Sequence, residues 1–288
     1  MPRVARVTTI TAASPAPAPV GRLLRDWRER RRLTQLDLAL RAEVSARHLS
    51  FVETGRSRPT SEMILRLARH LDVPLRDRNV LLLSGGYAPE YPAHGLSDPP
   101  MSAVNDAIEH VLRAHEPFPA VAIDAGWEMV AANDAVPLLI EGAAAALLEP
   151  PVNVLRLSLH PEGMASRIVN LPEWRAHLLD RLDRDIVSTA DPALIELRRE
   201  LAAYPCPPPA SRPDVRAILV PMRLRVRSAT LSLFSTTTVF GTPRDITLSE
   251  LAIESFYPAD PATAAFLKGG LPSVDVLVQG VSKPGSRQ

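Results

Sequence analysis

The chain has 288 residues, 46% of them hydrophobic, which is enough for about two ordinary globular domains. No apolar run approaches the ~18–20 residues of a membrane span, and the single cysteine, Cys206, excludes an intramolecular disulfide and a zinc site built from thiolates. The net charge of +1 is uneven, because residues 1–95 carry 16 Arg against 9 acidic residues (+7) and the remainder carries 17 basic against 23 acidic residues (−6). These features favour a cytosolic protein whose first third meets a polyanion.

The first third predicts a flexible tail followed by a compact all-α domain. Residues 1–19 are rich in Ala, Pro and Thr and lack the apolar stretch of a signal peptide. Apolar residues then recur at helical spacing, and Thr34, Ser45 and Thr60 stand where N-caps are expected. The predicted helices cover residues 20–32, 35–42, 46–54, 61–71 and 75–84. Together they define a domain over residues 20–86.

The second and third of these helices have the pattern of a helix-turn-helix, whose second helix enters the major groove of DNA. An inner face between the two helices is predicted from apolar spacing at Leu38, Ala39, Val44, Leu49 and Val52. The remaining residues of the third helix then face outward. We therefore predict double-stranded DNA as a partner, although five packed helices alone would also give this core.

Candidate DNA contacts follow from this placement. Arg47 suits a bidentate pair with guanine, and Ala46 or Phe51 could touch a thymine methyl group. Gln35 is placed to bond a phosphate, and Arg56 and Arg58 follow the helix as phosphate contacts. The outward set is completed by Ser45 and Ser50. Taken singly, Arg47 or Phe51 is more often a solvated or packing residue, and Glu53 is expected to brace the fold.

Beyond the first domain, residues 87–100 are rich in Pro, Gly and Tyr and predict a linker. An α+β domain over residues 101–270 follows, with a tail at 271–288. Helices are predicted at 101–114, 173–187 and 192–203, with Asn133 as N-cap of a further one, and a proline-rich loop at 205–209. Strands are predicted at 120–124, 127–131, 222–226, 230–240 and 246–257. The expected fold is an antiparallel sheet of about five strands with helices inserted after the second.

Two sets of motifs carry a family resemblance. The run from Thr34-Gln35 through Val44-Ser45 to Leu49–Arg56 and Pro59 resembles the XRE family of phage-repressor-type regulators, and RHLSFVETGRSRP its MmyB-like branch. Glu43 departs from the glycine often found there, at a cost of about 1 kcal/mol if the turn is left-handed. Segments 157–164, 167–170, 173–179 and 254–260 resemble the MmyB-type ligand-binding domain. The resemblance implies a lambda-repressor-like first domain, a PAS-like second domain and an apolar ligand, with fatty-acyl compounds among the candidates.

The candidate ligand-binding residues are Trp127, Asn133, His160, Trp174 and Phe234. Each has a structural alternative, because the aromatic residues could be core, His160 precedes a proline and could shape a turn, and Asn133 could cap a helix. The simplest interpretation of Arg223, Arg225 and Arg227 is that they form the solvated face of a strand. The alternative is that they bind an acidic ligand head group or a partner.

These predictions define a sequence-specific transcription regulator that acts as a homodimer on a palindromic operator at the nucleoid and responds to an apolar ligand. The alternative is a constitutive repressor or antitoxin-like regulator whose second domain only dimerises or binds a partner. An apolar cavity of about 300 Å³ or more would favour sensing, and a filled interior the alternative. No nucleotide-binding, hydrolase or metalloprotease motif is present, so we expect no catalytic residue, metal or cofactor.

Overall fold

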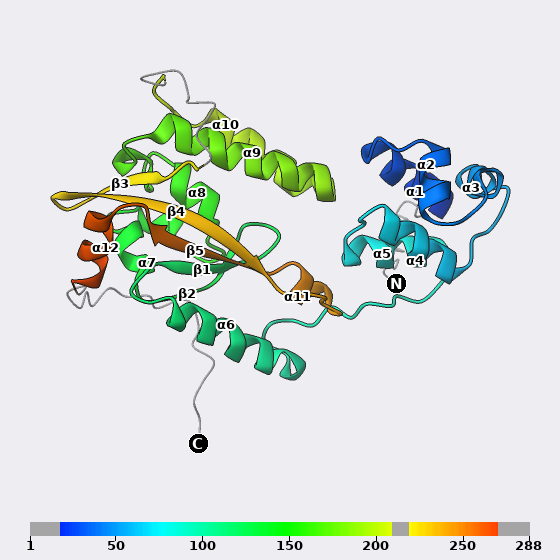
Figure 1. Cartoon of the computed structure of the whole chain (residues 1–288), viewed down its shortest axis with the longest axis horizontal. Coiled ribbons are helices and arrows are strands. Elements are labelled where there is room, and N and C mark those ends of the chain that lie inside the picture. Colours follow the sequence, from blue (N-terminus) through cyan, green and yellow to red (C-terminus); the bar gives the residue numbers. More distant parts are fainter. Residues whose placement is uncertain (1–17, 209–218, 270–288) are drawn as a thin grey trace, which may run out of the picture. The chain divides into compact units, whose positions relative to one another are not determined.

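The computed structural model describes residues 18–208 and 219–269, in two compact units divided as Met1–Glu90 and Tyr91–Gln288 (Figure 1). The predicted C-terminal tail, residues 1–17 of the N-terminal tail and Pro209 of the predicted loop lie outside the described residues. None of the described helices combines the length and apolar character needed to cross a bilayer.

The first unit contains the five predicted helices: α1 (Val20–Arg30), α2 (Gln35–Arg41), α3 (Ala46–Glu53), α4 (Ser61–His70) and α5 (Leu75–Ser84). Three of them start at the predicted N-caps. The side chains of Thr34, Ser45 and Thr60 each accept a hydrogen bond from a backbone N–H in the first turn, which satisfies a donor that the helix itself leaves free. The local sequence therefore sets where these helices begin.

The turn between α2 and α3 fixes the angle of the helix-turn-helix. Glu43 has a φ of 53°, so the left-handed turn is kept without the usual glycine. Of the predicted inner face, Leu38, Ala39, Leu49 and Val52 are buried and Val44 is half-buried. Gly21 lets α1 approach α3 closely, because a Cβ there would lie 2.0 Å from the Val52 carbonyl oxygen.

The second unit is built on five antiparallel strands in the order β2-β1-β5-β4-β3. Its strands are β1 (Ala120–Ile123), β2 (Met129–Ala132), β3 (Met222–Val226), β4 (Ala229–Val239) and β5 (Ala252–Pro258). Its α-helices are α6 (Ser102–Ala114), α7 (Val136–Ile140), α8 (Val154–Leu159), α9 (Leu171–Thr189), α10 (Pro192–Ala203), α11 (Ile246–Ser249) and α12 (Pro261–Lys268). The predicted α+β fold with helices after the second strand is confirmed.

Helices cover both faces of the sheet (Figure 1). Helices α7 to α10 pack on one face and enclose the main core, which includes Leu155, Trp174 and Leu182. Helix α6 packs on the other face, where Ile108 and Leu112 contact the central strands. This arrangement explains why every residue of β1 is buried.

One strand prediction is wrong in part. The segment predicted as a strand over 246–257 begins with helix α11, because Asp245 caps it by accepting a hydrogen bond from Leu248 N–H. Strand β5 starts only at Ala252. A short apolar run such as residues 246–251 does not by itself separate a one-turn helix from the start of a strand.

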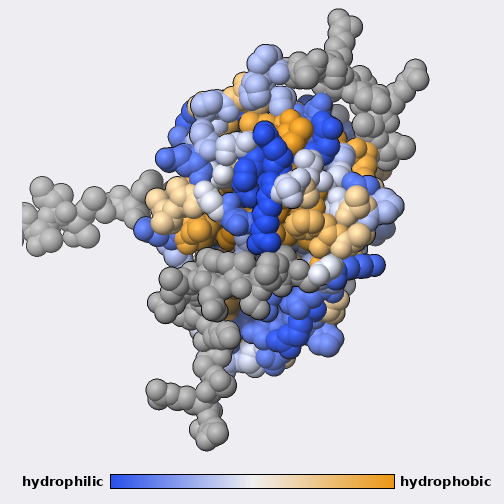
Figure 2. All heavy atoms as spheres, turned by 90° about the vertical axis from the view of Figure 1, so that its left-hand side faces the viewer, coloured by the Kyte–Doolittle hydropathy of each residue, from blue (hydrophilic) through white to orange (hydrophobic). Residues whose placement is uncertain are grey.

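Strand β3 forms an edge of the sheet and exposes the arginines that alternate with its core residues. Arg223 and Arg225 are exposed, as the prediction of a solvated face requires, and Arg227 lies in the following turn, 3.8 Å from Glu141. On the face shown in Figure 2, at the β3–β4 hairpin end of this unit, hydrophilic residues interrupt the hydrophobic areas. Charged side chains on an edge strand oppose pairing with a strand of another chain.

Residues 87–100, the predicted linker, make ordered contacts within both units. In the first unit the Tyr87 hydroxyl donates to the Pro59 carbonyl oxygen. In the second unit, Ile246 N–H donates to the Pro92 carbonyl oxygen and His94 Nδ1 lies 2.7 Å from Asp245 Oδ2. We call residues 91–98 the docking segment, because they fasten the start of the second unit to α11.

Candidate functional site

The outward face of α3 carries the residues that sequence reasoning assigned to DNA. Arg47 is exposed, and its guanidinium lies 5.4 Å from the centre of the Phe51 ring. Ala46, Ser50 and Phe51 are half-buried, and the exposed Ser45 uses its hydroxyl to cap the helix. The structure thus brings these five residues together at one helix, with Arg47 held by a cation–π contact that limits its freedom.

A buried network ties this helix to the rest of the first unit. Arg28 of α1 donates from Nε and Nη2 to the Glu53 carboxylate, at 2.7 and 2.8 Å, and the two side chains are 9% and 1% exposed. Gln35 Nε2 donates to the same carboxylate at 2.8 Å. Glu53 therefore braces the fold, as expected, by joining α1, α2 and α3. Gln35 keeps one amide N–H for the predicted phosphate contact.

The loop after α3 carries the other two predicted phosphate contacts. Arg56 is exposed, and its backbone N–H is bonded to the Phe51 carbonyl oxygen at 2.8 Å. Arg58 is also exposed, but its Nη2 donates to the Gly85 carbonyl oxygen and its guanidinium lies 5.9 Å from the Tyr87 ring centre. Arg58 would meet a phosphate with its remaining N–H groups.

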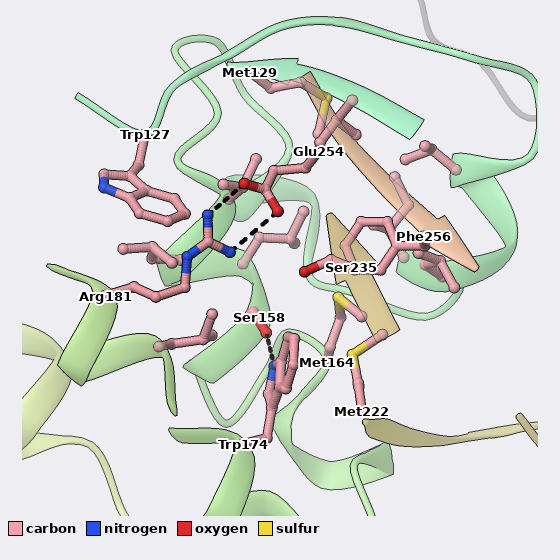
Figure 3. Close-up of a pocket in the computed structure, with 18 residues that line it drawn as sticks. Trp127, Met129, Ser158, Met164, Trp174, Arg181, Met222, Ser235, Glu254 and Phe256 are labelled. Carbon is pink, nitrogen blue, oxygen red and sulfur yellow. Dashed lines mark hydrogen bonds and ion pairs between the residues drawn. The ribbon is translucent and has the colours of Figure 1, made fainter. Parts of the chain in front are cut away.

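The second unit contains an apolar pocket between the sheet and helices α7 to α9 (Figure 3). Its lining residues are Val121, Trp127, Met129, Val136, Leu139, Ile140, Val154, Leu155, Leu157, Ser158, Met164, Trp174, Leu178, Arg181, Met222, Ser235, Glu254 and Phe256. The cavity volume is about 70 Å³, below the roughly 300–1,000 Å³ of typical ligand pockets. The cavity is thus smaller than the size that would favour sensing, and a ligand of ordinary size needs side chains to move.

A buried ion pair crosses the pocket. Arg181 of α9 donates from Nη1 to Glu254 Oε2 of β5 at 3.1 Å and from Nη2 to Glu254 Oε1 (Figure 3). The two side chains are 16% and 4% exposed. The Arg181 Nη2 also donates to the Thr237 hydroxyl at 3.0 Å, and that hydroxyl donates to Glu254 at 2.6 Å. These bonds offset the cost of burying both charges.

Two of the predicted ligand residues line the pocket. Trp174 donates from its indole N–H to the Ser158 hydroxyl at 3.0 Å. Trp127 has a φ of 62° in the β1–β2 turn and donates its indole N–H to Asp185 at 3.1 Å. Burial raises the pKa of Asp185, although the Trp127 bond opposes that shift. Both indoles are buried and form part of the core as well.

The other three predicted ligand residues do not line the pocket. Asn133 caps no helix; it is buried and bonds the backbone at Leu112, Phe118 and Ala120. His160 shapes a turn, since its Nδ1 accepts a hydrogen bond from Glu162 N–H. Phe234 stacks on Tyr257 on the opposite face of the sheet, because its neighbour Ser235 faces the pocket.

The pocket also contains functional candidates that sequence reasoning missed. Arg181 and Glu254 lie 73 positions apart, and no spacing rule pairs them. The alternation of side chains between the two faces of β4 and β5 was the one sequence signal that could have identified these pocket residues. Once Glu254 is placed on the pocket face, the register places Thr237 beside it and Ser235 two residues further along the same face.

An exposed, arginine-bearing helix that is fixed by buried bonds to two other helices is typical of a helix-turn-helix DNA-binding domain. The same chain carries a second unit with an apolar pocket. Comparison with family models agrees. Residues 24–77 match a helix-turn-helix model, and residues 104–269 match the MmyB-like transcription regulator ligand binding domain. The chain belongs to this family and is a DNA-binding transcription regulator with an XRE-type helix-turn-helix. No curated protein matches it.

Proposed function

We propose that this regulator binds a palindromic operator as a homodimer and that an apolar molecule in the pocket of the second unit changes its affinity for DNA. The observation that supports the DNA site is Arg47, exposed on α3 and held over Phe51. A regulator of this kind would act in the cytoplasm, at the nucleoid. The cavity of about 70 Å³ does not by itself favour ligand sensing over a constitutive repressor or antitoxin-like protein; the support for sensing is the match of residues 104–269 to a ligand binding domain.

Arg47 is expected to determine base preference. Arg47→Ala should cost roughly 1–3 kcal/mol of affinity for the cognate operator and relax selection at one base pair, because a bidentate contact to guanine is lost. Arg56→Ala is the matched control, an exposed arginine in the next loop, and should weaken cognate and random DNA by the same factor. Fluorescence anisotropy titrations on both DNAs measure this. Unchanged cognate binding by Arg47→Ala would remove Arg47 from the set of base readers.

Dimer binding is expected to leave a two-fold footprint. One recognition helix reads only a few base pairs, so specific binding calls for two helices at half-sites about one helical turn apart. Hydroxyl-radical footprinting should show two protected half-sites, and each should lose protection when the other is scrambled. Full-affinity occupancy of a single half-site by a monomer would contradict the dimer.

A further inference from the structure

The outer face of the sheet, the one opposite the pocket, is covered by α6 over only part of its width. Ile108 and Leu112 of α6 pack with Ala120, Ala122 and Ile253 of the central strands, and α6 contacts β1 and β2 (Figure 1). The outer-face residues of β3 and β4 lie beyond this cluster and are exposed or half-buried. We call six of them the open half-sheet: Arg223, Arg225, Thr230, Ser232, Thr236 and Thr238.

The antiparallel pairing of β3 with β4 places these six side chains on one face. Arg225 pairs with Thr230, whereas Leu224 pairs with Leu231 and both leucines are buried in the main core. The other members follow at even spacing along the two strands, so they point the same way. Residues two positions apart on a strand are separated by about 7 Å, and the two arginines therefore stand in a row.

The open half-sheet is a positive surface on an acidic part of the chain. Residues 219–244 contain four arginines and no acidic residue, so the 23 acidic residues of the segment 96–288 all lie outside them. Arg223 and Arg225 are exposed and form no ion pair with any residue that the structure describes. A face that served only for solubility would mix charges of both signs. Charge of one sign favours a polyanion as partner.

Four hydroxyl groups share this face with the arginines. The hydroxyls of Thr230, Ser232, Thr236 and Thr238 have no hydrogen-bond partner in residues 18–208 and 219–269. Arginine, serine and threonine are among the side chains that bind DNA phosphates, and such contacts carry no sequence information. The polyanion that a DNA-binding regulator meets is DNA, and the first unit, once bound, holds the second at a high effective concentration near the flanking duplex.

We propose that the open half-sheet binds the phosphate backbone of double-stranded DNA beside the operator, as a second and sequence-independent contact of this regulator. Arg223 and Arg225 pair with phosphates, and the neighbouring hydroxyl groups donate to phosphate oxygens. The contact is weak by itself and adds to the affinity that α3 provides. It requires neither the proposed homodimer nor the proposed ligand sensing.

The test removes both charges from the full-length protein and measures the salt dependence of DNA binding. Arg223→Gln with Arg225→Gln keeps long polar side chains on the exposed strand face, so the fold should be unaffected. On random-sequence duplexes of about 60 base pairs, the double variant should bind roughly tenfold more weakly than wild type at about 0.1 M salt. The slope of log K against log salt concentration should become about 1.8 less steep, because two phosphate contacts are lost.

Arg184→Gln with Arg199→Gln is the charge-matched control. Both arginines are exposed, on α9 and α10, and Arg199 pairs with the exposed Glu196 of its own helix. This control should leave affinity and slope unchanged. Equal losses in the two double variants would show an effect of net charge alone and would overturn the contact. Unchanged DNA binding by Arg223→Gln with Arg225→Gln would also overturn it, and a loss of self-association or of an acidic protein partner in that variant would then assign the face to that occupant.

Hydroxyl-radical footprinting locates the contact on the DNA. On a long fragment that carries the operator, wild type should protect backbone outside the sequence that α3 reads, and Arg223→Gln with Arg225→Gln should lose only this outer protection. Identical footprints for the two proteins would contradict a second contact. Loss of the inner protection would contradict it as well, because the substitutions would then act through the first unit.

Discussion

Glu53→Ala is expected to lower the free energy of unfolding of the first unit by about 3–5 kcal/mol, because it leaves the buried Arg28 guanidinium without its counter-charge. The loss is large because Glu53 accepts two bonds from Arg28 and one from Gln35, and its side chain is 1% exposed. Operator affinity should fall with stability, since α3 loses its link to α1 and α2. Hydrogen exchange at α1 and α3 amides of the full chain reports this unit separately from the second.

The control is the ion pair Arg25–Glu29, which lies on the same helix and has the same 2.7 Å separation. Its side chains are 57% and 52% exposed. Glu29 Oε1 also lies 3.8 Å from Arg28 Nη2, but at this exposure Glu29→Ala should change protection of α1 little or not at all. The two substitutions therefore differ mainly in burial. Equal effects from both would show that desolvation is not the reason for the role of Glu53.

The helices of the first unit could be predicted because their signals are local. Caps at Thr34, Ser45 and Thr60 and apolar residues at helical spacing mark starts and inner faces within a few residues. Strand β3 could also be predicted, since it alternates strictly between buried and exposed residues, whereas the start of β5 could not. What these segments share is that the residues that determine the structure lie close together in sequence.

The pocket could be predicted only in part because its members come from distant segments. Trp127 and Trp174 were identified as large aromatic residues, and they do line it. Phe234 is also a large aromatic residue but lies on the other face of the sheet. Successive residues of a strand point to opposite faces, so a shift of one position decides whether a side chain reaches the pocket. Asn133 was misassigned because its side chain bonds three backbone groups that only the folded chain brings near it. The Arg181–Glu254 pair depends on the packing of α9 on β5, which no local pattern reveals.

Ligand sensing requires a connection between the pocket and the chain segment that leads to the first unit. Strand β5 contributes Glu254 and Phe256 to the pocket, and α11 immediately precedes it. The docking segment is fastened there through His94 and Asp245, and to α6 through Asn105 Nδ2, which donates to the Leu96 carbonyl oxygen at 2.6 Å. We therefore expect the route from the pocket to run through α6 and α11, which both contact the docking segment.

Loosening the docking segment is expected to weaken the coupling of the two activities. In the wild-type protein a bound ligand should change operator affinity by about 1–3 kcal/mol, roughly 5- to 150-fold, since a ligand shifts only those states that it binds unequally. His94→Ala with Asn105→Ala removes the bonds of the His94 ring and the Asn105 amide and leaves the backbone N–H of residue 94 on Asp245 and that of Ile246 on Pro92. It should reduce this change, with ligand affinity and ligand-free DNA affinity preserved. Ile108→Pro is less suitable, because Ile108 is 2% exposed and proline there would break α6 and its packing.

The control for this variant is His110→Ala, an exposed histidine on α6 that should leave the coupling unchanged. Operator titrations with and without a saturating ligand measure the coupling, and fluorescence titrations measure ligand affinity in the same samples. If the double variant keeps the full ligand-dependent change, the docking segment does not transmit it. A ligand that binds the DNA-binding and non-binding states of the protein equally well does not change their populations. If the wild type binds ligand and its operator affinity does not change, the second unit therefore acts in assembly alone.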